Sequence, residues 1–246
     1  MKPINKGLKP IFLILLSVVL SCDASNEKQS NDYTVSHFGA LKNFMHKNDL
    51  SAKVDLKDFE KNNPLYGLGA LENLKGEVLI WDGKPFISME KDNSVSVESS
   101  FDFKAGLFVY SEVEDWKSYT IPEDVKNYQH LESFIAQTAK DHGIKADTPF
   151  PFLLDGNYAF IDWHVINWPE GDENHTHEKH KTSGPHGKLD NIDADVLGFY
   201  SEQHHAIYTH HSTNMHMHFK TTAGDLAGHV DDIQISNTVL LLPTIE

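Results

Sequence analysis

Apolar and polar residues alternate strictly from Asn214 to Phe219, where the sequence reads NMHMHF. Successive side chains of a β-strand point to opposite faces of the sheet. The pattern therefore predicts a strand whose two methionines and phenylalanine face the core, while His216 and His218 project together from the other face. The apolar face would hold both imidazoles in fixed positions.

The residues that follow predict a turn and a returning strand. The run TTAGDL at residues 221–226 is rich in turn-forming residues, and the strand after it carries His229. If the hairpin is centred between residues 223 and 224, His229 lies opposite His218, with the Cβ atoms about 5 Å apart. Three imidazoles that converge in this way are typical of a catalytic zinc site with an open coordination position. The alternative is that His-x-His occurs by chance in a chain with 16 histidines.

Elsewhere the pattern favours short strands and few helices. Apolar residues at helical spacing predict two amphipathic helices, at residues 33–47 and 127–140. Strand-like patterns occur at residues 76–81, 84–89, 94–100, 107–110, 158–166, 194–199 and 232–242, with a hairpin turn at Asp82-Gly83. The proline-containing run 148–151 predicts a boundary between an N-terminal half, residues 33–150, and a C-terminal metal-binding half, residues 151–246. We therefore expect an α+β protein of two packed halves.

The charge balance excludes some classes of partner. The chain has 36 acidic and 21 basic residues, all 21 of them lysine, which gives a net charge of -15. Nucleic acids and anionic membranes bind clusters of lysine and arginine, so neither is expected as a binding partner of the folded part.

The N-terminus predicts export. Residues 1–22 combine a lysine-bearing start with an apolar run of about ten residues, too short to span a bilayer. The run ends at Cys22, the one cysteine of the protein, in a lipobox-like context that predicts lipidation. Residues 23–32 would then be a flexible tether, and the protein would be a membrane-anchored lipoprotein facing the periplasm or the cell surface of a bacterium. The alternative is an ordinary signal peptide with an incidental cysteine.

Several short motifs, taken in order and spacing, resemble one enzyme family. They are Gly67-Leu68-Gly69, Leu74-Lys75-Gly76-Glu77-Val78, Asp82-Gly83, Leu197-Gly198-Phe199, His216-Met217-His218-Phe219 and Ala227-Gly228-His229-Val230. This set is similar to the α-acetolactate decarboxylases over nearly the whole chain after the tether. The resemblance implies two related halves, built on mixed or antiparallel sheets with few helices, and a zinc ion between them. It also implies the conversion of 2-acetolactate, or a related 2-hydroxy-3-oxo acid, to acetoin and carbon dioxide.

The resemblance also assigns roles to particular residues. It implies that His216, His218 and His229 bind Zn²⁺ and that Glu77 is the catalytic carboxylate that faces the metal. Loss of carbon dioxide leaves an enediolate that must be protonated, and a carboxylic acid beside it can deliver that proton. The alternative for Glu77 is a surface glutamate at the start of a strand.

Two positions depart from the family pattern. Ile166 stands where the family has an arginine, and Ala70 stands where it has a threonine. No other arginine exists in the chain, and lysine does not reproduce the planar, two-pronged guanidinium. His164, which lies in the same stretch as Ile166, or a lysine could supply a cation instead, and His164 is our candidate for substrate binding.

A histidine-rich stretch at residues 169–190 has no counterpart in these motifs. It could bind transition metals, or it could be a solvated, mobile surface insertion. Three hypotheses therefore remain: a zinc-dependent decarboxylase, a metal-binding homologue that binds a small hydroxy acid, and a periplasmic metal-scavenging lipoprotein. The expected partners are a small hydroxy or keto acid, the membrane that holds the anchor and, in a homodimer, a second copy of the chain.

Overall fold

The computed structural model describes residues 1, 33–145 and 147–245. Apart from Met1, the predicted signal segment with Cys22 and the predicted tether lie outside the described residues. Within the described residues, no helix has both the length and the apolar composition needed to cross a membrane.

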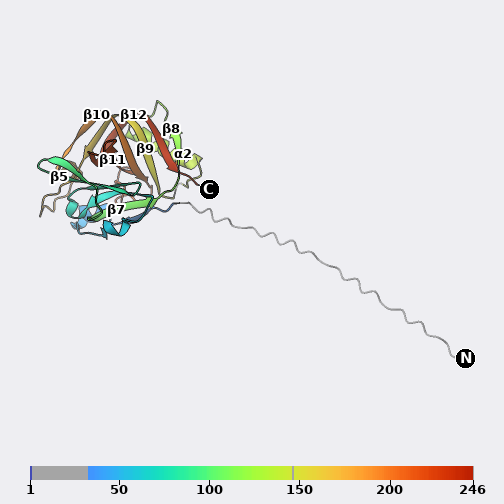
Figure 1. Ribbon diagram of the computed structural model, residues 1–246, viewed down its shortest axis with the longest axis horizontal. Coiled ribbons are helices and arrows are strands. Elements are labelled where there is room, and N and C mark those ends of the chain that lie inside the picture. The colour runs from blue at the N-terminus through green and yellow to red at the C-terminus, as the bar shows by residue number, and fades with distance from the viewer. Residues whose placement is uncertain (2–32, 146, 246) are drawn as a thin grey trace.

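Two antiparallel sheets make up most of the fold (Figure 1). The first sheet contains β1 (Ser36–Phe38), β2 (Val54–Asp55), β3 (Leu65–Leu71), β4 (Glu77–Trp81), β5 (Lys84–Lys91), β6 (Ser94–Glu98) and β7 (Lys104–Glu112). Its order is β1-β7-β3-β4-β5-β6, with β2 also paired to β7. The family resemblance implied antiparallel or mixed sheets with few helices, and this expectation is confirmed.

The second sheet closes on itself. It contains β8 (Trp116–Thr120), β9 (Phe150–His164), β10 (His186–Tyr200), β11 (Met215–Thr221) and β12 (Ala227–Pro243). Its order is β11-β10-β9-β12-β8, and β11 also pairs with β12. The strands β9, β10, β11 and β12 therefore form a ring, which lies above the first sheet in Figure 1.

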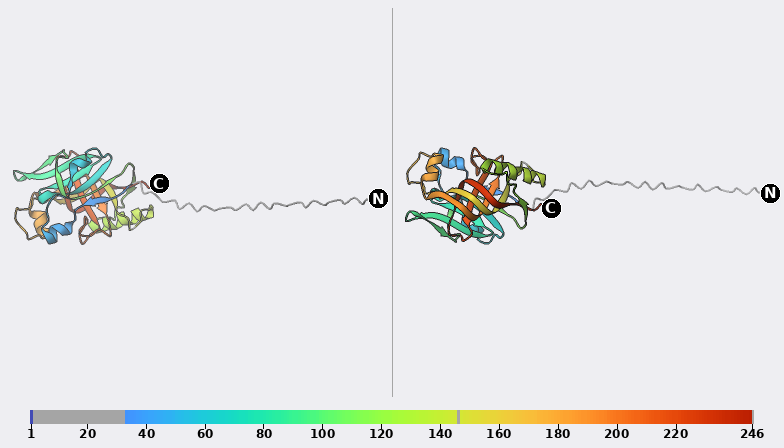
Figure 2. Two further views of the ribbon diagram at one scale, coloured as in Figure 1. Left: turned by 90° about the horizontal axis from the view of Figure 1, so that it is seen from below. Right: turned by 90° about the horizontal axis from the view of Figure 1, so that it is seen from above.

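The helices lie at the ends of the sheets. They are α1 (Leu41–Lys47), α2 (Tyr128–Asp141) and α3 (His177–Thr182), with short 3₁₀ turns at Leu56–Phe59 and Glu72–Leu74. Both views of Figure 2 place α1 and α3 side by side at one end and α2 at the opposite end. The predicted helix at residues 127–140 is confirmed, and the side chain of Asn127 accepts a hydrogen bond from the backbone N–H of His130 at its start.

The main core lies between the two sheets. In β4, successive side chains point alternately to this core and to the opposite face of the first sheet. Leu79 belongs to the large apolar cluster that the first sheet shares with the second. Val78 and Ile80 point to the other face, where a smaller cluster includes Leu56 and Phe59. Glu77 is therefore on the same face as Leu79, toward the second sheet.

Two sequence expectations need correction. The predicted helix at residues 33–47 begins only at Leu41, because residues 36–38 form β1 and pair with β7, and Gly39 adopts a φ of 76° between the two elements. The proline-containing run 148–151 is not a break between the sheets, because β9 begins at Phe150. The chain passes from the first sheet to the second between β7 and β8, at residues 113–115.

Gly198 fixes a close contact within the ring. It pairs with Phe152 of β9, and a Cβ atom at residue 198 would lie 2.1 Å from Cζ of the buried Phe152 ring. We expect Gly198→Ala to lower the free energy of unfolding by roughly 1–3 kcal/mol, because the ring must move within a packed core. Chemical denaturation of both proteins measures this difference.

Gly187→Ala provides a matched control on the same strand. A Cβ atom there would meet its nearest neighbour, Nε1 of Trp163, at 3.8 Å, an ordinary contact. Its free energy of unfolding should change by less than about 1 kcal/mol. Equal losses of stability in the two variants would contradict the proposed contact.

Candidate metal centre

The hairpin of β11 and β12 has the predicted register. Lys220 pairs with Ala227, Phe219 with Gly228, and His218 with His229, so the turn is centred between residues 223 and 224. Met215, Met217 and Phe219 are at most 1% exposed, which confirms the apolar face. His216 and His218 therefore project together beside His229.

Strand pairing also brings a fourth histidine to this place. His229 pairs with His218 of β11 on one side and with His164 of β9 on the other. Residues directly opposite in neighbouring strands share one face of a sheet. The imidazoles of His218, His229 and His164 thus form a row across β11, β12 and β9. The ring centroids of His164 and His229 are 4.8 Å apart.

His216, His218 and His229, here called the histidine triad, can offer one nitrogen each within 4.8 Å of one another. Nε2 of His216 lies 3.2 Å from Nδ1 of His229. The ring centroids are 5.0 Å apart for His216 with His218 and with His229, and 5.3 Å apart for the remaining pair. The triad therefore converges on one point, as ligands of a single ion must.

The electrostatics of the triad suit a metal cation. Burial lowers the pKa of His216 to about 4 and holds the pKa values of His218 and His229 well below their usual range. The imidazoles are therefore neutral at pH 7, the form that binds metals. Within the described residues, neither ring nitrogen of His218 has a hydrogen-bond partner, although the side chain is fully buried. Such orphaned nitrogens are costly to bury, and a metal ligated by Nε2 would satisfy one of them.

Glu77 approaches the triad from the other sheet. Its Oε2 lies 3.6 Å from Nε2 of His218, and its Oε1 lies 3.8 Å from Nε2 of His164. Gly76 permits this placement, because its φ is 152° and a Cβ atom there would lie 2.3 Å from the carbonyl oxygen of Ser88. The alternative of a surface glutamate is wrong, since Glu77 is 5% exposed.

Burial determines the protonation state of Glu77. Desolvation raises the pKa of its carboxyl well above the ordinary value of 4.5, while a hydrogen bond from the backbone N–H of Ile166 opposes the rise. The N–H of Ile166 lies 3.3 Å from Oε1. In the metal-free protein burial therefore favours the protonated carboxyl, the form that can donate a proton.

His164 lies in the site but is held by a residue that the sequence analysis missed. Its Nδ1 is 2.9 Å from Oδ2 of Asp231, whose side chain is only 2% exposed. Asp231 is the extra residue at an irregularity of β12 between Val230 and Asp232. Because a bulge redirects side chains, alternation along the strand could not place Asp231. His164, His229 and Asp231 form a second group that could hold a metal ion.

A cavity of about 340 Å³ is lined by His216 and His229 of the triad and by Glu77, His164 and Asp231, while His218 is not among its lining residues. The two positions that depart from the family pattern, Ala70 and Ile166, both line it, and Ala70 pairs with Glu77 across β3 and β4. Six histidines also line the cavity: His164, His177, His180, His210, His216 and His229. The departures therefore replace polar groups by apolar ones at the wall of the site itself.

The histidine-rich stretch is a folded cover rather than a structureless insertion. Residues 177–182 form α3, and β10 begins at His186. The ring of His175 stacks on that of Trp168, with centroids 4.2 Å apart, and its Nδ1 lies 2.8 Å from Nε2 of His180. These contacts fix α3 over the cavity, which His177 and His180 line.

The sequence profile of the alpha-acetolactate decarboxylase family matches residues 33–246. The chain belongs to this family. No curated protein matches the sequence.

Solved structures show the shared fold. Alpha-acetolactate decarboxylase from Bacillus subtilis strain 168 has 14% sequence identity and a TM-score of 0.69, with 86% of each chain covered. Acetolactate decarboxylase from Bacillus subtilis subspecies spizizenii has 14% identity and a TM-score of 0.66, with 85% of each chain covered. A Staphylococcus aureus protein of unknown function, described as similar to alpha-acetolactate decarboxylase, has 16% identity and a TM-score of 0.65 over 87% of this chain and 86% of its own.

If the triad binds a metal, removing one ligand should remove most of the affinity. We expect His216→Ala and His229→Ala each to weaken binding of a divalent transition metal by more than about 100-fold, because two imidazoles remain of three. Titration of the metal-free protein measures the change. His186→Ala is the control, since His186 is exposed and pairs with His164 in the same sheet. Full retention of metal by the triad variants would rule out the site.

Proposed function

We propose that this protein is a zinc-dependent decarboxylase that converts 2-acetolactate, or a related 2-hydroxy-3-oxo acid, to acetoin and carbon dioxide. The observation that supports the proposal best is the position of Glu77. A buried carboxyl whose pKa is raised faces the histidine triad across the interface of the two sheets. Family membership supports the same reaction class.

The triad would hold Zn²⁺, with His216, His218 and His229 as neutral nitrogen ligands. A bound zinc ion would act as a Lewis acid toward the oxygen atoms of the substrate. The protein contributes the rigid hairpin that fixes the ligands and the apolar cavity wall that excludes water. Leu74, Leu107 and Ile166 are buried members of that wall.

Glu77 would move the proton in this reaction. Decarboxylation breaks the bond between the carboxylate carbon and C2, and the electron pair stays behind as an enediolate. Transfer of a proton from Glu77 to carbon then gives acetoin, and the carboxylate regains a proton from solvent. The hydrogen bond from the Ile166 N–H to Oε1 would keep the carboxyl in place through the cycle.

His164 would take part of the role that arginine has in the family. Its ring lines the cavity, and Asp231 fixes its orientation through Nδ1, which leaves Nε2 directed toward Glu77 and the cavity. Because the Nδ1–H donates to the Asp231 carboxylate, Nε2 of the neutral ring is an acceptor, and it could accept a hydrogen bond from the hydroxyl group of a substrate. A single contact of this kind fixes the substrate less firmly than a guanidinium does.

A second function is favoured by the same departures. With Ile166 and Ala70 at its wall, the cavity suits a metal-binding homologue that binds a small hydroxy acid without converting it. The binding homologue and the decarboxylase would have the same metal site. The two hypotheses differ in whether the zinc-loaded protein converts the bound acid.

We further propose that the protein acts outside the cytoplasm, held to a membrane by lipidation of Cys22. The apolar N-terminal run, its lipobox-like end and the polar residues 23–32 support this placement. The described residues begin again at Tyr33, where the family match also begins.

Supplying racemic acetolactate to the zinc-loaded protein tests the main proposal. We expect formation of acetoin and carbon dioxide well above the spontaneous rate, and no such excess in the metal-free protein. Both products are followed over time at matched protein concentration. Tightly bound zinc without any excess acetoin would exclude the decarboxylase and support the binding homologue.

Substitution of Glu77 tests its role. Glu77→Gln preserves the shape of the side chain but removes the acidic proton, so we expect zinc binding to persist while kcat falls by roughly 10²–10⁴-fold. Glu72→Gln, on the 3₁₀ turn that precedes β4, is the matched control and should keep full activity. Unchanged turnover by Glu77→Gln would remove the proposed acid role.

A further inference from the structure

Two histidines at the edge of the cavity are outside the machinery described so far. His177 begins α3, and His210 lies in the loop before β11. Both line the cavity that His216 and His229 of the triad also line, yet His177 is exposed and His210 is half-buried. They therefore lie between solvent and the buried ligands, and they are here called the outer pair.

The geometry of the outer pair resembles that of the triad. The ring centroids of His177 and His210 are 4.7 Å apart, compared with 5.0–5.3 Å within the triad. Nδ1 of His210 lies 2.8 Å from Oγ of Ser212, a contact that orients the ring and leaves Nε2 for another ligand. The ring centroid of the exposed His211 lies 4.1 Å from that of His210, but among the described residues His211 does not complete a group of three metal ligands with the outer pair.

The other histidines of the cover are not available in the same way. His175 and His180 contact each other through Nδ1 and Nε2, and Nε2 of His175 also lies 3.0 Å from Oδ1 of Asn48. Both rings pack on Trp168. This second pair therefore has a structural role, because it fixes the cover to the body of the protein.

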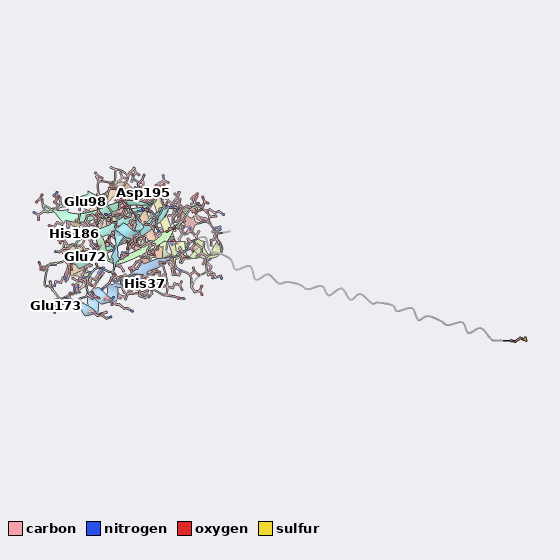
Figure 3. The ribbon with its side chains drawn as sticks, turned by 60° about the horizontal axis from the view of Figure 1, so that its bottom comes forward. His37, Glu72, Glu98, Glu173, His186 and Asp195 are labelled. Carbon is pink, nitrogen blue, oxygen red and sulfur yellow. The ribbon has the colours of Figure 1, made fainter. Side chains whose placement is uncertain are left out.

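The charged side chains of the cavity wall favour cations. Asp231 and Asp232 line the cavity, none of the described residues that line it is a lysine, and Nζ of Lys181 lies 3.7 Å from Oδ2 of Asp231. Figure 3 labels Glu98 and Glu173, both exposed, at separate places on the protein. The net charge of -15 favours the approach of metal cations to the protein as a whole.

We propose that His177 and His210 form an outer binding site for a divalent transition-metal ion, which is captured there and then passes to the histidine triad. Imidazole is a good ligand for zinc, cobalt, nickel and copper, and two imidazoles bind with modest affinity. Modest affinity suits a transfer site, because the ion must leave it again for the three-ligand site. The transfer step rests on the metal-binding part of the proposed function, whereas the outer site itself does not.

Cobalt binding to the full-length, metal-free protein tests the proposal, because the visible absorption of Co²⁺ reports its ligands without any catalytic assay. In the wild type we expect one tight site and a second, weaker site. In the double variant His177→Gln/His210→Gln we expect the weaker site to disappear and loading of the tight site to slow by about fivefold or more at low cobalt concentration. The absorption spectrum and final affinity of the tight site should stay unchanged.

A matched double variant controls for the loss of two imidazoles. His46 and His142 are both exposed, and neither lines the cavity. His46→Gln/His142→Gln should therefore load at the wild-type rate and keep the weaker site. Equal slowing in this control would overturn the proposal, because it would show an effect of general surface composition.

The remaining outcomes separate the outer site from the triad. If the outer-pair variant keeps two cobalt sites and loads at the wild-type rate, the outer site is excluded while the triad stands. If the wild type keeps only the weaker site, and that site disappears in the outer-pair variant, the triad and the proposed function fail while the outer site stands. A wild type that binds no cobalt overturns both.

Discussion

The site depends on one constraint, the register in which His218 of β11 meets His229 of β12. A slip by one residue would turn His216 and His218 to the face that Met215, Met217 and Phe219 now occupy, and the triad would be lost. The register is fixed on both sides, because β11 pairs with β10 and β12 pairs with β9 along most of its length. The closed ring of four strands thus fixes the positions of the imidazoles before any ligand binds.

This arrangement stores an electrostatic cost that a metal ion can relieve. Within the described residues, Nδ1 of His216 and both ring nitrogens of His218 are buried without a hydrogen-bond partner. Unpaired buried groups of this kind each cost on the order of 1–3 kcal/mol. Binding of a cation by the folded state alone offsets part of that cost and stabilises the fold by mass action. Stability and metal content should therefore be linked in this protein.

The sequence predicts parts of the site that depend on local pattern. Alternation from Met215 to Phe219 and the turn chemistry after it are local, and they predicted the hairpin and its register. Placing Glu77 opposite the triad needed the family resemblance, because it depends on how two sheets pack. The position of Asp231 was not predictable, since it follows from a bulge in β12. Likewise, β1 forms only because residues 36–38 pair with β7, a distant strand that overrides their helical spacing.

The absence of arginine from the cavity wall affects the order in which a metal ion and an acidic substrate would bind. No lysine is among the described residues that line the cavity, whereas Asp231 and Asp232 line it, so the cavity wall favours cations over an anionic acid. A divalent ion in the triad would supply positive charge, and the carboxylate of a substrate could then enter at lower cost. A guanidinium at position 166, where the family resemblance implies an arginine, would provide part of that attraction without a metal. Under the proposed function, the metal would therefore bind to this chain before the substrate.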